Sequence, residues 1–199
     1  MNLLIFYLNN FTRIFIAVLV LIFSLQSWTK ADDIRDFEIE GMSVGDSLLD
    51  FMSKSFIDKD KEAMFPNKKY LTSFYEHKST QYDDIQFDFL ANDSNYIIHG
   101  MEAKKYFPED INGCLSKQKE ISQSIIEIVG KQYQESSSPH RGDESGKSIN
   151  YFNAWWFDDG SSLQVYCTDW SKETALTDEL KVSTANKELN DFIRYEAYD

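Results

Sequence analysis

The stretch 148–169 constrains this chain most, because it has the pattern of a β-hairpin. Two runs rich in aromatic and β-branched residues flank the dipeptide Asp159-Gly160, which tolerates the positive φ angles of a type I′ turn. A two-residue loop at this dipeptide pairs Asp158 with Ser161 and sets the register of both strands. The sequence therefore predicts a sheet in which this hairpin is a main component.

The predicted register sorts the hairpin side chains into two faces. The mostly apolar face is the better candidate for the core and consists of Phe152, Ala154, Trp156, Leu163, Val165 and Cys167. The opposite face mixes polar and aromatic side chains, namely Asn153, Trp155, Phe157, Gln164 and Tyr166. Because exposed aromatic residues mark binding surfaces, Trp155, Phe157 and Tyr166 form a candidate binding patch. A helix packed on this face would instead make the three residues part of the core.

The N-terminal segment has the organisation of a secretory signal peptide. Arg13 supplies a positive charge, residues 14–25 form a continuous apolar run, and Thr29 and Ala31 offer the small residues that signal peptidase requires. The apolar run is shorter than the ~20 residues that cross a bilayer. We therefore expect cleavage after residue 31 and export to the periplasm or out of the cell.

An uncleaved signal anchor is the alternative, in which residues 3–28 hold the protein in the inner membrane with its domain outside. With cleavage, residues 32–199 remain, and their 168 residues suit a single domain with one core. We expect no stable membrane insertion of this domain after cleavage.

The chain is strongly acidic. Its formal net charge is −13, and removal of residues 1–31, whose charged residues are Arg13 and Lys30, makes it −15. Such a chain is repelled by the phosphate backbone of nucleic acids and by anionic membrane surfaces. Nucleic-acid binding is therefore not expected, whereas cationic ligands and basic partners are compatible with the charge.

Cys114 and Cys167 are the two cysteines of the chain. In an exported protein two cysteines most simply form one disulfide, which here joins the start of a helix to the second hairpin strand. A cysteine nucleophile is the alternative. It is disfavoured because neither cysteine lies in a recognisable nucleophile turn and an oxidising compartment acts against a lone thiol.

The remaining periodicities complete an α+β layout, a mostly antiparallel sheet built from hairpins with one long and two or three short helices packed on it. Alternating side chains predict further strands at 36–40, 70–77, 81–90, 96–101 and 179–185. Helical periodicity predicts helices at 43–52, 114–133 and 186–197, with caps at Ser43, Asn112 and Asn186. The long helix carries an apolar stripe of Leu115, Ile121, Ile125, Ile128, Val129 and Tyr133. Composition predicts a flexible loop at 134–147.

Known catalytic and metal-binding motifs are absent from the sequence. His77 and His99, taken with Asp84 or Asp88, do not have the spacing of a metal site. We therefore expect no metal, no cofactor and no catalytic residue. A small exported hydrolase that uses Asp84 or His99 is the alternative.

Three stretches resemble a group of exported bacterial proteins of unknown function: DFEIEGMSVGDSLLDF at 36–51, VYCTDWSKE at 165–173 and ELNDFI at 188–193. The resemblance covers most of the chain after the signal segment and implies a periplasmic or envelope location without an activity. The turn Gly41-Met42-Ser43 is also similar to the start of small outer-membrane assembly lipoproteins. This chain departs from their pattern because it has no cysteine to carry a lipid and is longer, so an assembly role is an analogy only.

These observations together predict a function class. The signal segment, the compact α+β core and the surplus aromatic residues on the hairpin favour an exported, non-enzymatic binding or interaction domain. Its partner would be an envelope protein or a small ligand.

Overall fold

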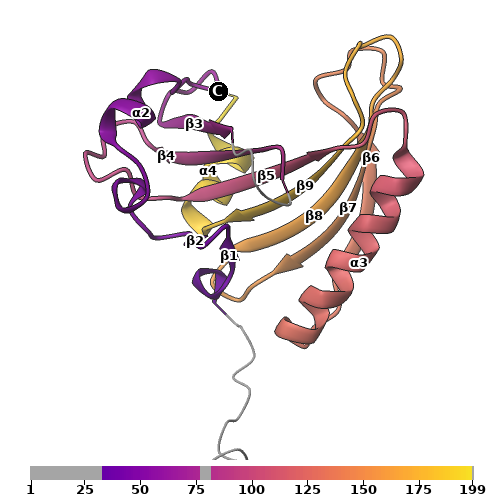
Figure 1. Ribbon diagram of the computed structural model, residues 1–199, viewed down its shortest axis with the longest axis horizontal. Coiled ribbons are helices and arrows are strands. Elements are labelled where there is room, and N and C mark those ends of the chain that lie inside the picture. Colours follow the sequence, from indigo (N-terminus) through magenta and orange to yellow (C-terminus); the bar gives the residue numbers. More distant parts are fainter. Residues whose placement is uncertain (1–32, 77–81, 199) are drawn as a thin grey trace, which may run out of the picture. The chain divides into compact units, whose positions relative to one another are not determined.

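A computed structural model describes residues 33–76 and 82–198 of the chain (Figure 1). In these residues a seven-stranded antiparallel sheet and a two-stranded sheet are accompanied by three α-helices. The predicted fold class, α+β with a mostly antiparallel sheet, is confirmed. Within the same residues, every helix is too short or too polar to cross a membrane.

The large sheet contains β3 (Tyr70–Glu76), β4 (Asp84–Leu90), β5 (Gly100–Tyr106), β6 (Gln134–Pro139), β7 (Ile149–Trp156), β8 (Ser162–Asp169) and β9 (Glu179–Ala185). The small sheet pairs β1 (Glu38–Ile39) with β2 (Met42–Ser43). The helices are α2 (Lys54–Lys59), α3 (Ile111–Val129) and α4 (Lys187–Tyr195), with 3-10 turns at Ile34–Asp36 and Leu48–Asp50. The strand order is β3-β4-β5-β9-β8-β7-β6, so β9 is central and β3 and β6 form the edges.

Three elements follow the sequence prediction closely. The strand predicted at 179–185 is β9, and the helix predicted after Asn186 is α4, which Asn186 caps. The long helix α3 begins earlier than predicted, because Asp110 rather than Asn112 caps it. It ends at Gly130, whose φ of 67° is costly for a residue with a Cβ.

Two predicted elements are wrong, and the strand predicted at 96–101 is displaced, because β5 begins at Gly100 and ends at Tyr106. The amphipathic helix predicted at 43–52 is β2 followed by a single 3-10 turn, because Gly45 has a φ of 98° and the N–H of Leu48 donates to the carbonyl of Tyr96. The loop predicted at 134–147 begins with β6, a strand whose six residues are all exposed. Its polar side chains carry no burial signal, so pairing with β7 alone makes it a strand.

The hairpin of β7 and β8 turns through three residues rather than the predicted two. The N–H of Phe157 donates to the carbonyl of Ser161, and the N–H of Gly160 donates to the carbonyl of Phe157, both at 3.0 Å. Gly160 has a φ of 87°, as in a type I turn followed by a G1 bulge. Trp155 consequently pairs with Leu163, and the register differs from the predicted one by one residue.

This difference exchanges the two faces of β7. One face, called the helix face below because α3 packs on it, contains Tyr151, Asn153, Trp155, Leu163, Val165 and Cys167. The opposite face contains Phe152, Ala154, Trp156, Gln164 and Tyr166. The predicted core residues of β8 are therefore confirmed. Of those predicted on β7, Ala154 is buried but lies on the opposite face, and Phe152 and Trp156 are only partly buried there.

The main core lies between the helix face and the elements that cover it. Helix α3 packs on β8 and β9 (Figure 1). The N-terminal segment 33–52 contributes Phe37 and Leu48, which cluster with Phe87 and Trp155. One continuous layer of buried apolar side chains thus joins both halves of the sheet.

Helix α4 covers one end of the opposite face and forms a second apolar cluster. Leu189 and Phe192 pack there with Tyr70 and Ala185. Gly100 permits the close approach of the helix, because a Cβ at that position would lie 2.4 Å from Cδ2 of Leu189.

The buried face of α3 is more polar than the predicted stripe. It consists of Cys114, Gln118, Ser122, Ile125 and Val129. Ile128, which the stripe included, is 53% exposed, and Leu115 and Ile121 are only partly buried. The helix is therefore rotated relative to the prediction, and it faces the sheet with two polar side chains.

The predicted disulfide is confirmed. Cys114 and Cys167 are bonded, their Cα atoms are 6.1 Å apart, and both residues are fully buried. The bond joins the first turn of α3 to β8 across a sequence separation of 53 residues. It therefore fixes one end of the helix on the sheet.

Replacing both cysteines by serine tests the contribution of this bond. The unfolded chain regains the freedom that a loop of this length removes, so we expect the free energy of unfolding to fall by about 4 kcal/mol. Urea unfolding of the double variant measures the loss. Wild-type protein in excess reductant should lose a similar amount, and an unchanged unfolding midpoint in both experiments would contradict the expectation.

Candidate functional site

Strand β6 is an open edge of the large sheet. It is last in the strand order, and in the described part of the chain its outer side pairs with no other strand. The other edge, β3, is bridged at one residue, because Glu62 exchanges N–H···O bonds of 2.9 and 2.8 Å with Thr72. In the described residues β6 has no such bridge, so its outward backbone groups are available to a partner.

The hydrogen-bond alternation of an antiparallel pair shows which groups of β6 are free. Just beyond the strand, the N–H of His140 donates to the carbonyl of Ser148 at 2.8 Å. Because the backbone groups that face the partner strand recur at every second residue, residues 134, 136 and 138 also point theirs towards β7. Glu135 and Ser137 then point their N–H and C=O groups outwards. Pro139 adds a carbonyl but has no N–H.

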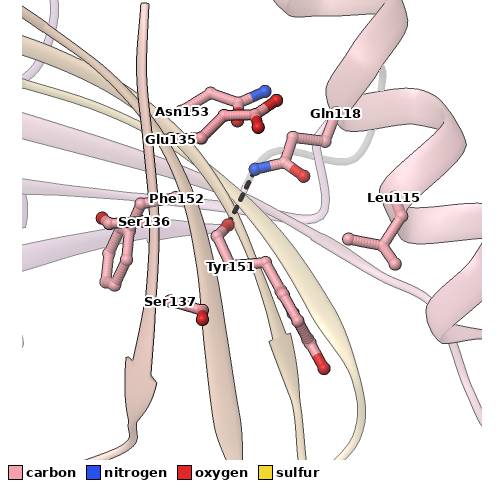
Figure 2. A pocket seen from close by; sticks show the side chains of 8 residues that line it. All are labelled: Leu115, Gln118, Glu135, Ser136, Ser137, Tyr151, Phe152 and Asn153. Atoms are coloured by element: carbon pink, nitrogen blue, oxygen red, sulfur yellow. Dashed lines mark hydrogen bonds between the residues drawn. The ribbon is translucent and has the colours of Figure 1, made fainter.

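A pocket lies next to this edge, between β6, β7 and α3. Its volume is about 360 Å³, and its lining residues are Leu115, Gln118, Glu135, Ser136, Ser137, Tyr151, Phe152 and Asn153 (Figure 2). Glu135 and Ser137 face this pocket because they pair with Asn153 and Tyr151 of the helix face. The two residues with free backbone groups therefore also place their side chains at the pocket.

Gln118 forms the floor of the pocket with its amide fixed in one orientation. Its Nε2 donates to the carbonyl of Tyr151 at 2.7 Å and to the carbonyl of Val165 at 2.9 Å. Two carbonyl acceptors require the amide nitrogen at this position, so the amide oxygen must point the other way. Figure 2 shows that oxygen turned towards the space between Leu115 and Tyr151.

Asn153 on β7 forms a second side-chain contact between the sheet and α3. Its Nδ2 lies 2.9 Å from Oγ of Ser122 on α3, and the residue is 7% exposed, compared with 5% for Gln118. In the described residues, neither amide oxygen has a hydrogen-bond partner. Among the described residues, the side-chain polar atoms that are fully buried and have no hydrogen-bond partner are Asp84 Oδ1 and Thr184 Oγ1. The two amide oxygens are not among these atoms, so they are not fully buried and are accessible through the pocket.

Glu135 brings negative charge to the rim. It is exposed, and together with burial its carboxylate raises the pKa of the neighbouring Tyr133 above the ordinary value. None of the pocket-lining residues is basic. The pocket therefore combines hydrogen-bond acceptors with a negative charge.

The predicted patch of Trp155, Phe157 and Tyr166 is not one surface. Trp155 is 1% exposed, lies under α3 and donates from Nε1 to the carbonyl of Lys131 at 2.9 Å. Phe157 is partly buried at the end of β7, with its ring 5.8 Å from that of Phe37. Tyr166 lies on the opposite face of the sheet. The three-residue turn separates them, because it shifts the register by one.

Tyr166 belongs to a charge network on the opposite face. Its hydroxyl donates to Glu102, and Nζ of Lys181 lies 3.7 Å from Glu102 and 2.8 Å from Glu179. Burial lowers the pKa of Lys181, but the two carboxylates outweigh burial and hold the pKa above its ordinary value. Burial and the charge of Glu102 raise the pKa of Tyr166. These groups satisfy one another, so they offer a ligand less than the pocket does.

Asp84 and His99 do not form a catalytic pair. Asp84 lies at the start of β4 and accepts a 2.8 Å hydrogen bond from Tyr106. His99 lies next to the other end of that strand, with its backbone N–H on the carbonyl of Asp88. The rise of four residue steps from Asp84 to Asp88 is roughly 13 Å along the strand. Nδ1 of His99 is 3.0 Å from the side-chain amide of Asn186.

The positions of the potential metal ligands do not support a metal site either. Residues 33–76 and 82–198 contain no group of three or more His, Cys, Asp or Glu side chains placed to hold a metal ion. His77, the other histidine weighed in the sequence, lies outside the described residues.

Comparisons with known proteins add no relative. A scan against protein-family models gave no match, and searches of curated proteins and of solved structures gave none either. The function is therefore argued from the site alone.

Sequence reasoning missed Gln118, Asn153 and the strand β6. A usable signal exists for Gln118, because Cys114, Gln118 and Ser122 recur at i, i+4 and i+8, and the disulfide turns that row towards the sheet. The two-residue turn predicted from the sequence puts Asn153 on the face opposite the predicted core. For β6 the sequence offers no signal, since all its side chains are exposed.

Trp155→Ala separates a core role from a binding role. Trp155 is buried under α3, so we expect the free energy of unfolding to fall by about 3–5 kcal/mol. Trp156→Ala is the matched control, because this adjacent residue points to the opposite face and is only partly buried. Urea unfolding measures both, and equal losses would contradict the assigned register.

Asp88→Asn tests the opposite face through pH. Burial, opposed by a hydrogen bond from Thr72 and reinforced by Glu102, raises the pKa of Asp88 from 3.8 to about 7. Between these two pKa values Asp88 keeps its proton in the folded chain and loses it in the unfolded chain. The free energy of unfolding therefore falls as pH rises from the lower pKa to the higher one. Above it, we expect Asp88→Asn to be more stable than wild type by roughly 2–4 kcal/mol.

Urea unfolding at about pH 5 and about pH 8 measures this difference. The advantage of Asp88→Asn should grow between the two conditions. Asp50→Asn removes the same charge from an exposed position and is the control. An advantage that does not change with pH would contradict the assignment to Asp88.

Proposed function

We propose that this chain is an exported, non-enzymatic binding domain that receives an extended segment of a partner protein on the outer edge of β6. The observation that carries the proposal is the coincidence of a free strand edge with a pocket lined by the same strand. Strand addition is a general mode of peptide recognition, in which main-chain hydrogen bonds supply affinity and adjacent pockets supply specificity.

The geometry of β6 determines how such a segment would bind. Glu135 and Ser137 offer two N–H and two C=O groups, so a paired strand gains up to four backbone hydrogen bonds from them. A residue opposite either of them directs its side chain to the helix face, because paired residues point the same way. One side chain of the segment therefore enters the pocket.

Export is supported by residues 1–31 and by the disulfide. The apolar run and small residues of the N-terminal segment have the pattern of a signal peptide. The bond between Cys114 and Cys167 suits an oxidising compartment. An envelope partner is consistent with the resemblance to exported bacterial proteins.

A second copy of the chain is the less favourable occupant of the edge. Each exported copy, without residues 1–31, carries a net charge of −15, so two copies repel one another at an edge that also carries Glu135. The polar, exposed side chains of β6 also give self-pairing no apolar area to bury. A partner with basic character avoids both disadvantages.

Ser137→Pro tests strand addition. Ser137 directs its N–H outwards, so proline removes that donor without removing a bond to β7. A displayed library of random peptides is selected on the full-length protein, and the enriched peptides are titrated. We expect Ser137→Pro to weaken the binding of these peptides roughly tenfold or more. This loss corresponds to the backbone hydrogen bond donated by residue 137 and the one next to it.

Ser137→Ala is the matched control, because it keeps the N–H and should bind as wild type does. Amide NMR spectra of both variants verify that the sheet is intact. Equal affinities for Ser137→Pro and Ser137→Ala, with both folded, would overturn the proposal. Concentration-dependent dimerisation that Ser137→Pro abolishes would assign the edge to a second copy instead.

A further inference from the structure

We infer that the pocket beside β6 holds a cationic side chain, a lysine ammonium or an arginine guanidinium, of the bound segment. The inference rests on the proposed strand addition, and it adds the chemistry of the residue that anchors the segment. The carrying observation is a pair of buried amides, in which Gln118 uses both N–H groups within the protein, Asn153 uses one, and both side-chain oxygens are free.

Three of the four amide donors of the pocket are committed. Both N–H groups of Gln118 Nε2 donate to backbone carbonyls, and one of the two N–H groups of Asn153 Nδ2 donates to Ser122. Their two oxygens remain as acceptors, accessible through the pocket and without a partner in the described residues. Both residues are more than nine-tenths buried, so these oxygens are held in place. These two oxygens favour a group that donates hydrogen bonds, and an ammonium or guanidinium donates several.

Charge favours the same class of ligand. Glu135 is the charged residue among those that line the pocket, and the chain as a whole carries −13. Partial burial strengthens the attraction between opposite charges relative to the same contact in bulk water. A carboxylate or phosphate would meet acceptors and a negative charge, and an apolar side chain would leave both amide oxygens unpaired.

The walls suit the stem of a long basic side chain. Leu115 and the ring of Tyr151 flank the space into which the Gln118 oxygen points (Figure 2). Lysine and arginine pack their methylene groups on apolar surface and carry the charge at the tip. A volume of about 360 Å³ is near the lower end of the ~300–1,000 Å³ range of ligand pockets, which suits one side chain.

Peptide chemistry tests the anchor first. The probes are the peptides enriched from the displayed library on full-length protein. We expect each to carry lysine or arginine at one fixed position, and replacing that residue by norleucine or citrulline should weaken binding roughly tenfold or more. Enrichment of acidic or purely apolar peptides would overturn the inference.

Charge changes in the protein test the pocket. Glu135→Lys should weaken the basic peptides roughly tenfold or more, and Asn153→Asp should strengthen them. Glu127→Lys is the matched control, because it makes the same charge change at an exposed position near the other end of α3. Equal losses in Glu135→Lys and Glu127→Lys would mean that only net charge matters and would overturn a specific pocket.

The two proposals fail in different ways. If Ser137→Pro abolishes binding while Glu135→Lys and the norleucine peptides bind normally, strand addition holds and the cationic anchor is wrong. The binding of N-acetyl-arginine amide is detected by NMR shifts of the Gln118 side-chain amide. If Glu135→Lys weakens this binding while Ser137→Pro binds every peptide normally, the pocket holds a cation and strand addition is wrong.

Discussion

The register of the β7–β8 hairpin is the constraint on which the rest of the structure depends. Side chains alternate along a strand, so the register decides which half of them faces the core. The three-residue turn that ends at Gly160 places Trp155 and Asn153 on the helix face, where α3 covers them. With a two-residue turn, Ala154 and Trp156 would face α3 instead, and Ser122 would lose its partner Asn153 on β7.

Much of the fold is encoded locally and could be predicted. The α+β class, the strand β9, the capped helix α4 and the pair Cys114–Cys167 each follow from patterns within one segment or from the redox compartment. The turn could not be assigned in the same way, because Asp159-Gly160 is compatible with both loop lengths. The choice between them depends on packing between the hairpin and a helix distant in sequence.

The site was harder to predict than the fold, for a related reason. Its main residues, Gln118 and Asn153, are polar, and a sequence pattern assigns polar residues to the surface. They are buried because each satisfies a partner on the other element: Gln118 bonds the backbone of β7 and β8, and Asn153 bonds Ser122 of α3. The disulfide at Cys114 holds the row of α3 that includes Gln118 against β8. Only the assembled pair of layers reveals these contacts.

The same contacts explain why a pocket remains where α3 meets β6. An amide that uses its nitrogen to join two elements must direct its oxygen elsewhere, and here that direction is towards the pocket. An apolar helix face would have joined α3 to the sheet without leaving acceptors beside β6. The two amides therefore have two consequences: they fix α3 on the hairpin, and they leave acceptors beside the free edge of the sheet. The proposed strand addition and the proposed cation selection then depend on one structural feature.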